Sequence, residues 1–400
     1  MAKYTSSSFS RQEIMLVTAL AFFQFTHIMD FMVLMPLGPR LIENFAITNH
    51  EFSWLVSSYT LAAAIMALIA STFIDRFHRK KALIHVYSGF LLGTLLCGLA
   101  DNFYLLLFSR MITGAFGGVM NALVFSIIGD SFDYSRRGSA TGIIMAAFSV
   151  ATVAGVPIGL WLANHMGWNA PFLFVFYAGL VALVFAHFTI PLTARVARNH
   201  PYRDLFREKN HLLAFALIFT MMLAGFSVIP YISNFLVFNA GFAVDKLPLI
   251  YLCGGAVTFF TSRLIGYLAD RYGKKRTYFV TAGLSIFPIF YISQISSPDT
   301  FVILLTTTTF FVFISGRFVP GMAIITSAVK PYMRGSFMTI NSSLQQFGSA
   351  TATIIGGFII SEKNNVIYGY DRVAWFAIAA SLLSLYLVYK IRILDGKEIN

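Results

Sequence analysis

The sequence predicts an all-α membrane protein of twelve transmembrane helices, arranged as two pseudo-symmetric six-helix bundles with both termini in the cytoplasm. Apolar residues make up 57% of the 400 residues and charged residues only 12%, which is too apolar for a soluble protein of this length. About twelve stretches reach the roughly 20 apolar residues that a spanning helix needs. A charged cassette occurs twice, each time directly after a long apolar stretch, and this repeat indicates two homologous halves.

The expected spans follow one another with short connections. The longest connection covers residues 195–210 and contains Pro201 and five basic residues, so we expect a cytoplasmic linker with a short surface helix. It separates a first half, residues 1–194, from a second half, residues 211–400. The spans are predicted near residues 14–38, 53–73, 82–100, 104–128, 139–164, 171–191, 212–237, 247–268, 277–295, 300–328, 336–361 and 373–391.

Basic residues predict the orientation, because Lys and Arg concentrate in short cytoplasmic loops. With the N-terminus inside, 22 of the 29 Lys and Arg residues fall on the cytoplasmic side. Four fall on the opposite side, and three lie within expected spans, namely Arg110, Arg263 and Arg317. The formal net charge of +12 therefore comes mainly from cytoplasmic loops, which we expect to lie against anionic lipid headgroups and not against nucleic acid.

Cysteine, histidine and acidic residues do not form the pattern of a metal or catalytic site. Cys97 and Cys253 fall in spans of different halves, which argues against a disulfide. His50 and Glu51 begin like a zinc-protease motif, but Trp54 stands where the second histidine belongs. We therefore expect no metal, no cofactor and no enzymatic activity.

The duplicated cassette is the most informative motif of the chain. It reads Asp-Arg-Phe-His-Arg-Lys-Lys at residues 75–81 and Asp-Arg-Tyr-Gly-Lys-Lys-Arg at residues 270–276. An Arg-Gly-Ser sequence is also repeated, at residues 137–139 and again at residues 334–336. The cassettes are offset by 195 residues and the second pair by 197, and this agreement favours duplication over coincidence.

These motifs resemble those of the major facilitator superfamily, specifically its bacterial drug:proton antiporter branch, and the resemblance covers the whole chain. The family's loop motif, Gly-x-x-x-Asp-Arg-x-Gly-Arg-Lys, is matched in the second half by Gly266, Asp270, Arg271, Gly273, Lys274 and Lys275. In the first half Ser71 and His78 replace the two glycines, which leaves Asp75, Arg76, Arg79 and Lys80.

Two further motifs carry the resemblance, one in the fourth span and one in the fifth. Arg-x-x-x-Gly is present as Arg110 and Gly114, and an antiporter motif resembles the segment that contains Gly155, Pro157 and Gly159. The resemblance implies a proton-coupled transporter of the bacterial inner membrane that works as a monomer and exports its substrate. Its loop motif implies a gate, in which aspartates at helix ends pair with arginines and lock one arrangement of the halves.

Ionisable side chains inside the spans predict the coupling site, because a charge in the hydrocarbon is costly and usually functional. Asp30 is the only acid well inside an expected span, and it falls about as deep as Arg110, roughly 27 Å from the cytoplasmic end. His27 and Gln24 precede Asp30 on the same side of the helix. We predict that Asp30, His27 and Arg110 couple protons to transport. A static ion pair and a merely hydrogen-bonded histidine are the alternatives.

The substrate cavity is predicted from polar residues in the other spans. Arg317 lies near the midplane without an acid in any span of its own half, so a bound anion is one candidate partner and helix packing is the alternative. Arg263 lies shallower, where its side chain can also reach lipid headgroups. The full set expected to line the cavity is Gln24, Tyr231, Asn234, Arg263, Arg317, Asn341 and Gln345.

These observations together predict a proton-coupled secondary active transporter that exports a small polar or anionic organic molecule, such as a carboxylate metabolite or a siderophore. The alternatives are multidrug efflux of lipophilic cations, in which Asp30 would meet the cation, and sugar efflux, which the Asn341 and Gln345 strip suits. A non-transporting membrane sensor is the alternative from a different class.

Overall fold

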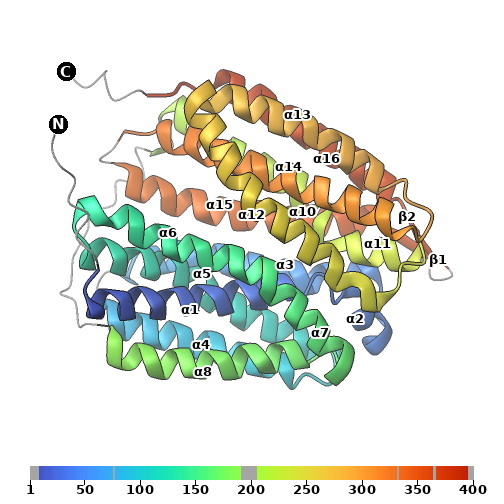
Figure 1. Ribbon diagram of the computed structural model, residues 1–400, viewed down its shortest axis with the longest axis horizontal. Coiled ribbons are helices and arrows are strands. Elements are labelled where there is room, and N and C mark those ends of the chain that lie inside the picture. The colour runs from blue at the N-terminus through green and yellow to red at the C-terminus, as the bar shows by residue number, and fades with distance from the viewer. Residues whose placement is uncertain (1–8, 75–76, 191–204, 331–332, 364–365, 395–400) are drawn as a thin grey trace.

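The computed structural model describes residues 9–74, 77–190, 205–330, 333–363 and 366–394. Long helices run side by side between two ends of the molecule (Figure 1). Helix α1 begins and helix α16 ends at the same end, which we call the terminal end, and the opposite end carries α2, α11 and a small hairpin. We call that opposite end the far end.

The first half contains α1 to α8, and two of its long helices begin at a capping box, in which side chains bind the free backbone N–H groups of the first turn. Ser10 and Glu13 form a capping box at the start of α1, and Thr48 and Glu51 form another at the start of α3. The elements are α1 (Arg11–Val33), α2 (Gly38–Phe45), α3 (Asn49–Ser71), α4 (Arg79–Gly98), α5 (Phe103–Ser131), α6 (Tyr134–Val150), a π-helical turn (Ala151–Gly155), α7 (Val156–Met166) and α8 (Ala170–Thr189).

The second half repeats this plan and adds one short hairpin. Its elements are α10 (Lys209–Phe226), a 3₁₀ turn (Ile229–Tyr231), α11 (Ile232–Phe238), a second 3₁₀ turn (Val244–Lys246), α12 (Leu247–Tyr272), α13 (Lys274–Ile292), α14 (Thr300–Ser327), α15 (Arg334–Ile359), strands β1 (Ser361–Lys363) and β2 (Val366–Tyr368), and α16 (Tyr370–Lys390). The strands pair antiparallel, with Glu362 opposite Ile367. Within the described residues this hairpin is the one departure from the expected all-helical architecture.

Each of the twelve expected spans coincides with one long helix or with helical pieces in direct succession. Ten of these helical stretches, within the described residues, are long and apolar enough to cross a membrane. The other two long helices are α13, which begins with three basic residues, and α15, which carries the polar strip around Asn341. The all-α membrane fold of twelve spans is therefore confirmed.

The two halves meet along two helix pairs. In the first pair, α3 packs against α15, where Gly357 faces Ser53 so closely that a β-carbon would lie 2.5 Å from the Ser53 side chain. Nearer the terminal end, Ser343 donates a hydrogen bond of 2.8 Å to the Ala64 carbonyl. In the second pair, α12 packs against the π-helical turn and α7, with Gly255 against Val153. Small residues thus allow close contact between the halves.

Three clusters of buried apolar side chains form the cores. At the terminal end each half has its own cluster, one containing first-half residues such as Leu20 and Leu123, the other containing second-half residues such as Ile218 and Phe337. At the far end one cluster draws on both halves, from Leu34 to Ile378. The halves therefore share a continuous core at the far end and have separate cores at the terminal end.

Candidate functional site

The deepest polar feature of the first half is an ion pair between α1 and α5. The Arg110 Nη1 atom donates to Asp30 Oδ2 at 2.7 Å, and both side chains are completely buried. Thr94 of α4 donates to the other carboxylate oxygen at 3.1 Å. The pair predicted from helix depth is therefore formed, and three helices contribute to it.

Close packing of α3 on α5 places an aromatic ring beside this pair. A β-carbon on Gly114 would lie 2.2 Å from the Tyr59 carbonyl oxygen, so only glycine allows the two helices to approach in this way. The Tyr59 ring centroid then lies 4.5 Å from the Arg110 guanidinium carbon, within the range of a cation–π contact. Arg110 Nε and Nη2 have no hydrogen-bond partner among the described residues, so part of the guanidinium is available for another acceptor.

His27 and Gln24 continue from Asp30 towards the terminal end, as the spacing predicted. Both side chains are buried, and neither His27 nitrogen nor the Gln24 carbonyl oxygen has a hydrogen-bond partner among the described residues. The His27 ring packs edge-on against Phe90 of α4. These residues therefore lie together with the ion pair in the interior of the first half.

Arg317, the predicted anion-binding residue, lies in the interior of the second-half bundle. Its Nη1 atom donates to Ser381 of α16 at 3.0 Å, and its Nη2 atom donates to the Met221 carbonyl of α10 at 3.2 Å. Only 1% of its surface is exposed. In this arrangement Arg317 joins α10, α14 and α16, which is the geometry that the packing alternative describes.

The other predicted cavity residues of α12 and α15 differ in exposure. Arg263 of α12 is exposed and stacks its guanidinium over Phe259, 4.5 Å from the ring centroid. Asn341 of α15 is buried, with its Oδ1 atom unpartnered among the described residues, whereas Gln345 is half-buried. The structure does not bring these residues into one group with Arg317.

Tyr231 and Asn234 lie in the contact between the halves at the far end. The Tyr231 hydroxyl donates to the Thr353 carbonyl of α15. Asn234 donates to the Asn49 side chain at 2.8 Å, and Asn49 in turn donates to Glu362 of the hairpin at 2.8 Å. This chain of amides and a carboxylate, which we call the far-end network, crosses from one half to the other.

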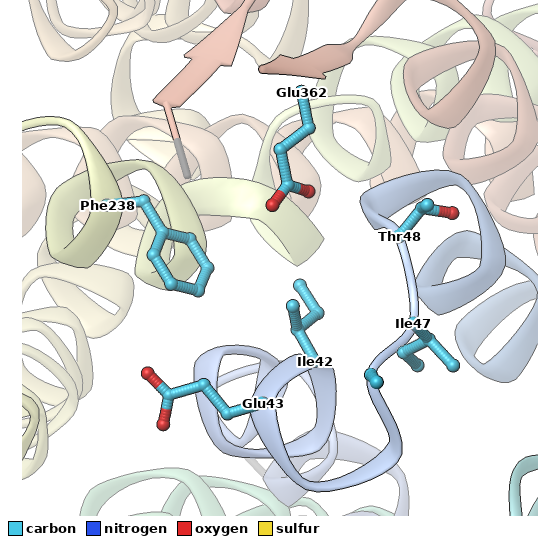
Figure 2. Close-up of a pocket in the computed structure, with 7 residues that line it drawn as sticks. Ile42, Glu43, Ile47, Thr48, Phe238 and Glu362 are labelled. Carbon is cyan, nitrogen blue, oxygen red and sulfur yellow. The ribbon is translucent and has the colours of Figure 1, made fainter. Parts of the chain in front are cut away.

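The far-end network was not predicted from the sequence, since Asn49 and Glu362 lie in expected loops with no motif around them. A pocket of about 540 Å³ opens beside it, lined by α2, α11 and the hairpin. Figure 2 shows Glu362 reaching into this pocket from β1, Glu43 extending from α2, and Phe238 on another side.

The duplicated loop motif is described only in part, because Asp75 and Arg76 lie outside the described residues. Arg79 approaches Asp130 at the end of α5, with 3.4 Å between Nε and Oδ2. In the second half Asp270 is exposed and Arg271 donates to the Tyr267 hydroxyl at 3.1 Å. Gly273 joins α12 to α13 with φ of +97°, a conformation that favours glycine, whereas Gly266 is half-buried within α12.

The predicted antiporter motif forms the π-helical turn and the start of α7. Pro157 has no backbone N–H, and the widened turn before it lies where a regular helix would lose a hydrogen bond. Gly155 and Gly159 face α1, where β-carbons would lie 3.3 Å from Met29 and 2.7 Å from Val33. The motif therefore packs on the helix that carries Asp30 and, through Val153, on α12 of the other half.

Comparison with known proteins places these features in a family. The model of the Major Facilitator Superfamily matches residues 20–353 and again residues 249–398. The chain is 24% identical over 366 residues to "Uncharacterized MFS-type transporter YceJ" of Bacillus subtilis (strain 168), covering 90% of this chain and 91% of that protein. It is 23% identical over 387 residues to "Multidrug resistance protein 2" of the same organism, covering 92% and 93%.

A solved structure has the same fold. The inward-facing, occupied crystal structure of a bacterial homolog of the human lysosomal transporter Spinster superposes with a TM-score of 0.76 at 15% identity, covering 96% of this chain and 97% of that chain. At this level of identity the likeness concerns the fold.

Proposed function

Because the chain belongs to the major facilitator superfamily, we propose that it is a proton-coupled secondary active transporter that exports a small organic molecule across the bacterial inner membrane. The family consists of multi-pass membrane transporters, and one of the relatives named above, YceJ, is described as an MFS-type transporter. Proton coupling, the outward direction and the substrate class are the proposed parts.

The observation that carries the proposal is the buried pair of Asp30 and Arg110. A carboxylate held at 2.7 Å from a guanidinium, with Thr94 on its second oxygen, stays ionised while the pair is closed. When substrate binding or rocking of the halves withdraws Arg110, the dry surroundings favour the protonated acid, so Asp30 takes up a proton. Reformation of the pair expels that proton.

Alternating access is supported by the distribution of the cores. The halves share one apolar core at the far end and have separate cores at the terminal end. The halves can therefore separate at the far end while the terminal-end core of each half stays intact. With the terminal end in the cytoplasm, the shared core lies on the outer side of the membrane in this arrangement. The protein works as a monomer in this proposal, since each half supplies one wall of the cavity.

For the substrate we propose a small polar or anionic molecule, and the residue that supports it is Arg263. This side chain is exposed on a spanning helix and contacts Phe259 through its ring face, so its N–H donors are available to a carboxylate or phosphate. Arg317 supports the idea less, because its donors already bind Ser381 and the Met221 carbonyl.

Efflux of lipophilic cations is the second candidate. The relative named "Multidrug resistance protein 2" favours it, and so do the carboxylates of Glu43 and Glu362 beside Phe238 in the far-end pocket. Sugar efflux would use the amides of Asn341 and Gln345.

The proposal is tested by reconstituting the full chain in liposomes loaded with a pH dye and adding citrate, a catecholate siderophore, lactose and ethidium in turn. One of these is expected to trigger proton flux, and Asp30→Asn is expected to reduce that flux to the level of empty vesicles. Asp101→Asn, which changes an exposed acid, serves as the matched control and should retain the flux.

Two results would contradict the proposal. Full substrate-driven proton flux in a folded Asp30→Asn protein would remove Asp30 from the coupling. Silence of the folded wild-type protein with all four probes would oppose proton-coupled transport of these classes and favour the sensor alternative.

A further inference from the structure

Three buried polar side chains near the ion pair carry atoms without a hydrogen-bond partner among the described residues, namely the Gln24 carbonyl oxygen, both His27 nitrogens and the Tyr59 hydroxyl. They are Gln24 and His27 of α1 and Tyr59 of α3, which are 7%, 6% and 1% exposed. Leaving one buried polar group unsatisfied costs about 1–3 kcal/mol, and native proteins keep such groups where they have a use. Three together on the path from Asp30 to the terminal end therefore require an explanation.

Gly117 of α5 is the point at which two of these side chains meet. A β-carbon at Gly117 would lie 2.5 Å from the Tyr59 hydroxyl and 2.9 Å from His27 Nε2. Both polar atoms are thus close to the same point, and they are at most about 5.4 Å apart. One oxygen that hydrogen-bonds to both atoms can span this separation.

Tyr59 connects this point to the ion pair. Its ring lies against the Arg110 guanidinium, 4.5 Å from the guanidinium carbon, while Arg110 itself binds Asp30. On the other side of His27, Gln24 is one helical turn nearer the terminal end and presents an unpartnered carbonyl oxygen. The order along the path is therefore Asp30 with Arg110, then Tyr59, then His27, then Gln24.

Resting on the proposed function, we propose that Tyr59 and His27 form a relay that carries the proton between Asp30 and the terminal end, and that Gly117 keeps the space between them open. The bridging oxygen belongs to a water molecule or to a hydroxyl group of the substrate.

The proton balance of the relay is closed. Once the pair with Arg110 has opened and the Tyr59 hydroxyl reaches the carboxyl group, Asp30 in its acid form gives its proton to the Tyr59 oxygen as the Tyr59 hydroxyl proton passes to the bridging oxygen. The bridging oxygen passes one proton to the unprotonated ring nitrogen of His27, and His27 releases the proton on its other nitrogen past the Gln24 carbonyl to water at the terminal end. Asp30 ends as a carboxylate paired with Arg110, and Tyr59, the bridge and His27 end neutral.

The charged and titratable groups that face His27 are few. From α3 the Tyr59 ring lies 6.4 Å from the His27 ring, from α5 the charge of Arg110 acts on it, and Asp30 lies on its own helix, whereas Tyr87 of α4 is paired with Thr26. Helices α6, α7 and α8 also pack on α1, and among the described residues their acids and bases are Arg136, Arg137 and His187 near the terminal end, the exposed His165 of α7 and the exposed Tyr177.

The chain offers matched control residues for both members of the relay. Tyr87 is as buried as Tyr59, but its hydroxyl is already paired with Thr26 at 2.8 Å. His211 is buried like His27, but its Nδ1 atom is paired with the Leu205 carbonyl at 3.2 Å. Tyr87→Phe and His211→Gln therefore remove comparable groups outside the relay.

The test uses protons alone as the probe. The full chain in lipid nanodiscs is taken by a rapid pH jump from alkaline to acidic buffer and back, and the carboxylic-acid C=O band that disappears in Asp30→Asn is followed by infrared spectroscopy. We expect Tyr59→Phe and His27→Gln to slow both the appearance and the loss of this band about tenfold or more, with unchanged final amplitude. Tyr87→Phe and His211→Gln should match the wild type.

Gly117→Ala adds a third variant, in which the new methyl group fills the space between the two polar atoms and should slow the band in the same way. Rates within about twofold of wild type in both Tyr59→Phe and His27→Gln, without substrate and again after addition of the substrate identified in the liposome assay, would overturn the relay while leaving the role of Asp30 intact. Absence of any Asp30-dependent band in the wild type would instead overturn the coupling proposal, and the relay with it. Because the assay contains no substrate, tenfold slowing assigns the bridge to water, and slowing seen only when substrate is added would assign it to a substrate hydroxyl.

Discussion

Arg110 and Arg317, fully buried arginines of opposite halves, are stabilised in different ways. Arg110 binds one acid and keeps Nε and Nη2 without a partner among the described residues, whereas Arg317 donates from both terminal nitrogens to Ser381 and to the Met221 carbonyl. A guanidinium with free donors can exchange one acceptor for another, but one that joins three helices cannot move without disturbing them. We therefore expect Arg110 to change its hydrogen-bond partners during transport and Arg317 to hold its three helices together.

Substitution of Arg317→Lys tests that assignment. A lysine keeps the charge but cannot donate in two fixed directions at once, so the free energy of unfolding should fall by about 1–2 kcal/mol. Buried Cys97 reports unfolding when it becomes reactive towards a fluorogenic thiol dye during heating. Arg263→Lys is the matched control, since Arg263 is exposed and contacts an aromatic ring, and it should leave the unfolding temperature unchanged. Equal unfolding temperatures for the wild type and Arg317→Lys would count against a supporting role.

Charged residues of the site were predictable, and neutral ones were not. Asp30 and Arg110 stand out because a charge in an apolar stretch is rare, and counting residues along each helix gave them similar depths. Tyr59, Thr94 and Gly117 resemble many other residues of spanning helices, and their importance comes from helix contacts that no local pattern encodes. The roles of all these residues stay predictions.

At the scale of elements, apolar stretches predicted where the spans lie but not where they break. The stretch predicted at 14–38 ends as a helix at Val33, before Pro36, and the chain resumes a helix at Gly38. The stretch predicted at 212–237 is interrupted by a 3₁₀ turn that contains Pro230. Hydropathy averages over such breaks, because proline changes hydrogen bonding more than it changes polarity. The β1–β2 hairpin was missed because three-residue strands have no measurable periodicity.

The far-end network yields a prediction for the hairpin and α11. Asn49→Ala removes both side-chain hydrogen bonds of Asn49. The loss destabilises the closed far end by about 1–2 kcal/mol, which shifts the equilibrium towards an open far end about 5- to 30-fold. Spin labels on the exposed residues Asn44 and Lys363 should then show an additional, longer distance.

Asn169→Ala provides the matched control for this measurement. Asn169 lies at the same end but donates to the Gly98 carbonyl within its own half, so its loss should leave the distance distribution as in the wild type. An unchanged distribution in Asn49→Ala would mean that the far-end network does not hold the halves together.

At the scale of the whole molecule, polar contacts follow the same division as the apolar cores. Near the terminal end Arg136 pairs with Glu13 inside the first half, and Lys274 donates to Ser327 inside the second. At the far end Asn49 binds partners in the opposite half. Each half is thus internally connected along its length, while the halves are joined by the far-end network and, nearer the terminal end, by the Ser343–Ala64 hydrogen bond, as expected for two bodies that move relative to each other.

A covalent bridge across the far end should therefore stop transport. In a protein with Cys253→Ser, the pair Asn49→Cys and Glu362→Cys can be joined by a short bifunctional methanethiosulfonate, since the native side chains already meet. Proton flux with the substrate identified in the liposome assay should fall to background after bridging and return on reduction. Continued flux in the bridged protein would exclude opening at this contact.

The contact between Gly255 and Val153 has a mechanical consequence. It lies 17 residues before Tyr272, so the remainder of α12 extends about 26 Å beyond it towards the terminal end. Rotation of about ten degrees around this fulcrum displaces the tip of α12 by about 4.5 Å, nearly the 5.4 Å pitch of one helical turn. A small tilt of α12 at Gly255 therefore opens a gap between the halves at the terminal end, and the charged loop after α12 moves with the end of the helix.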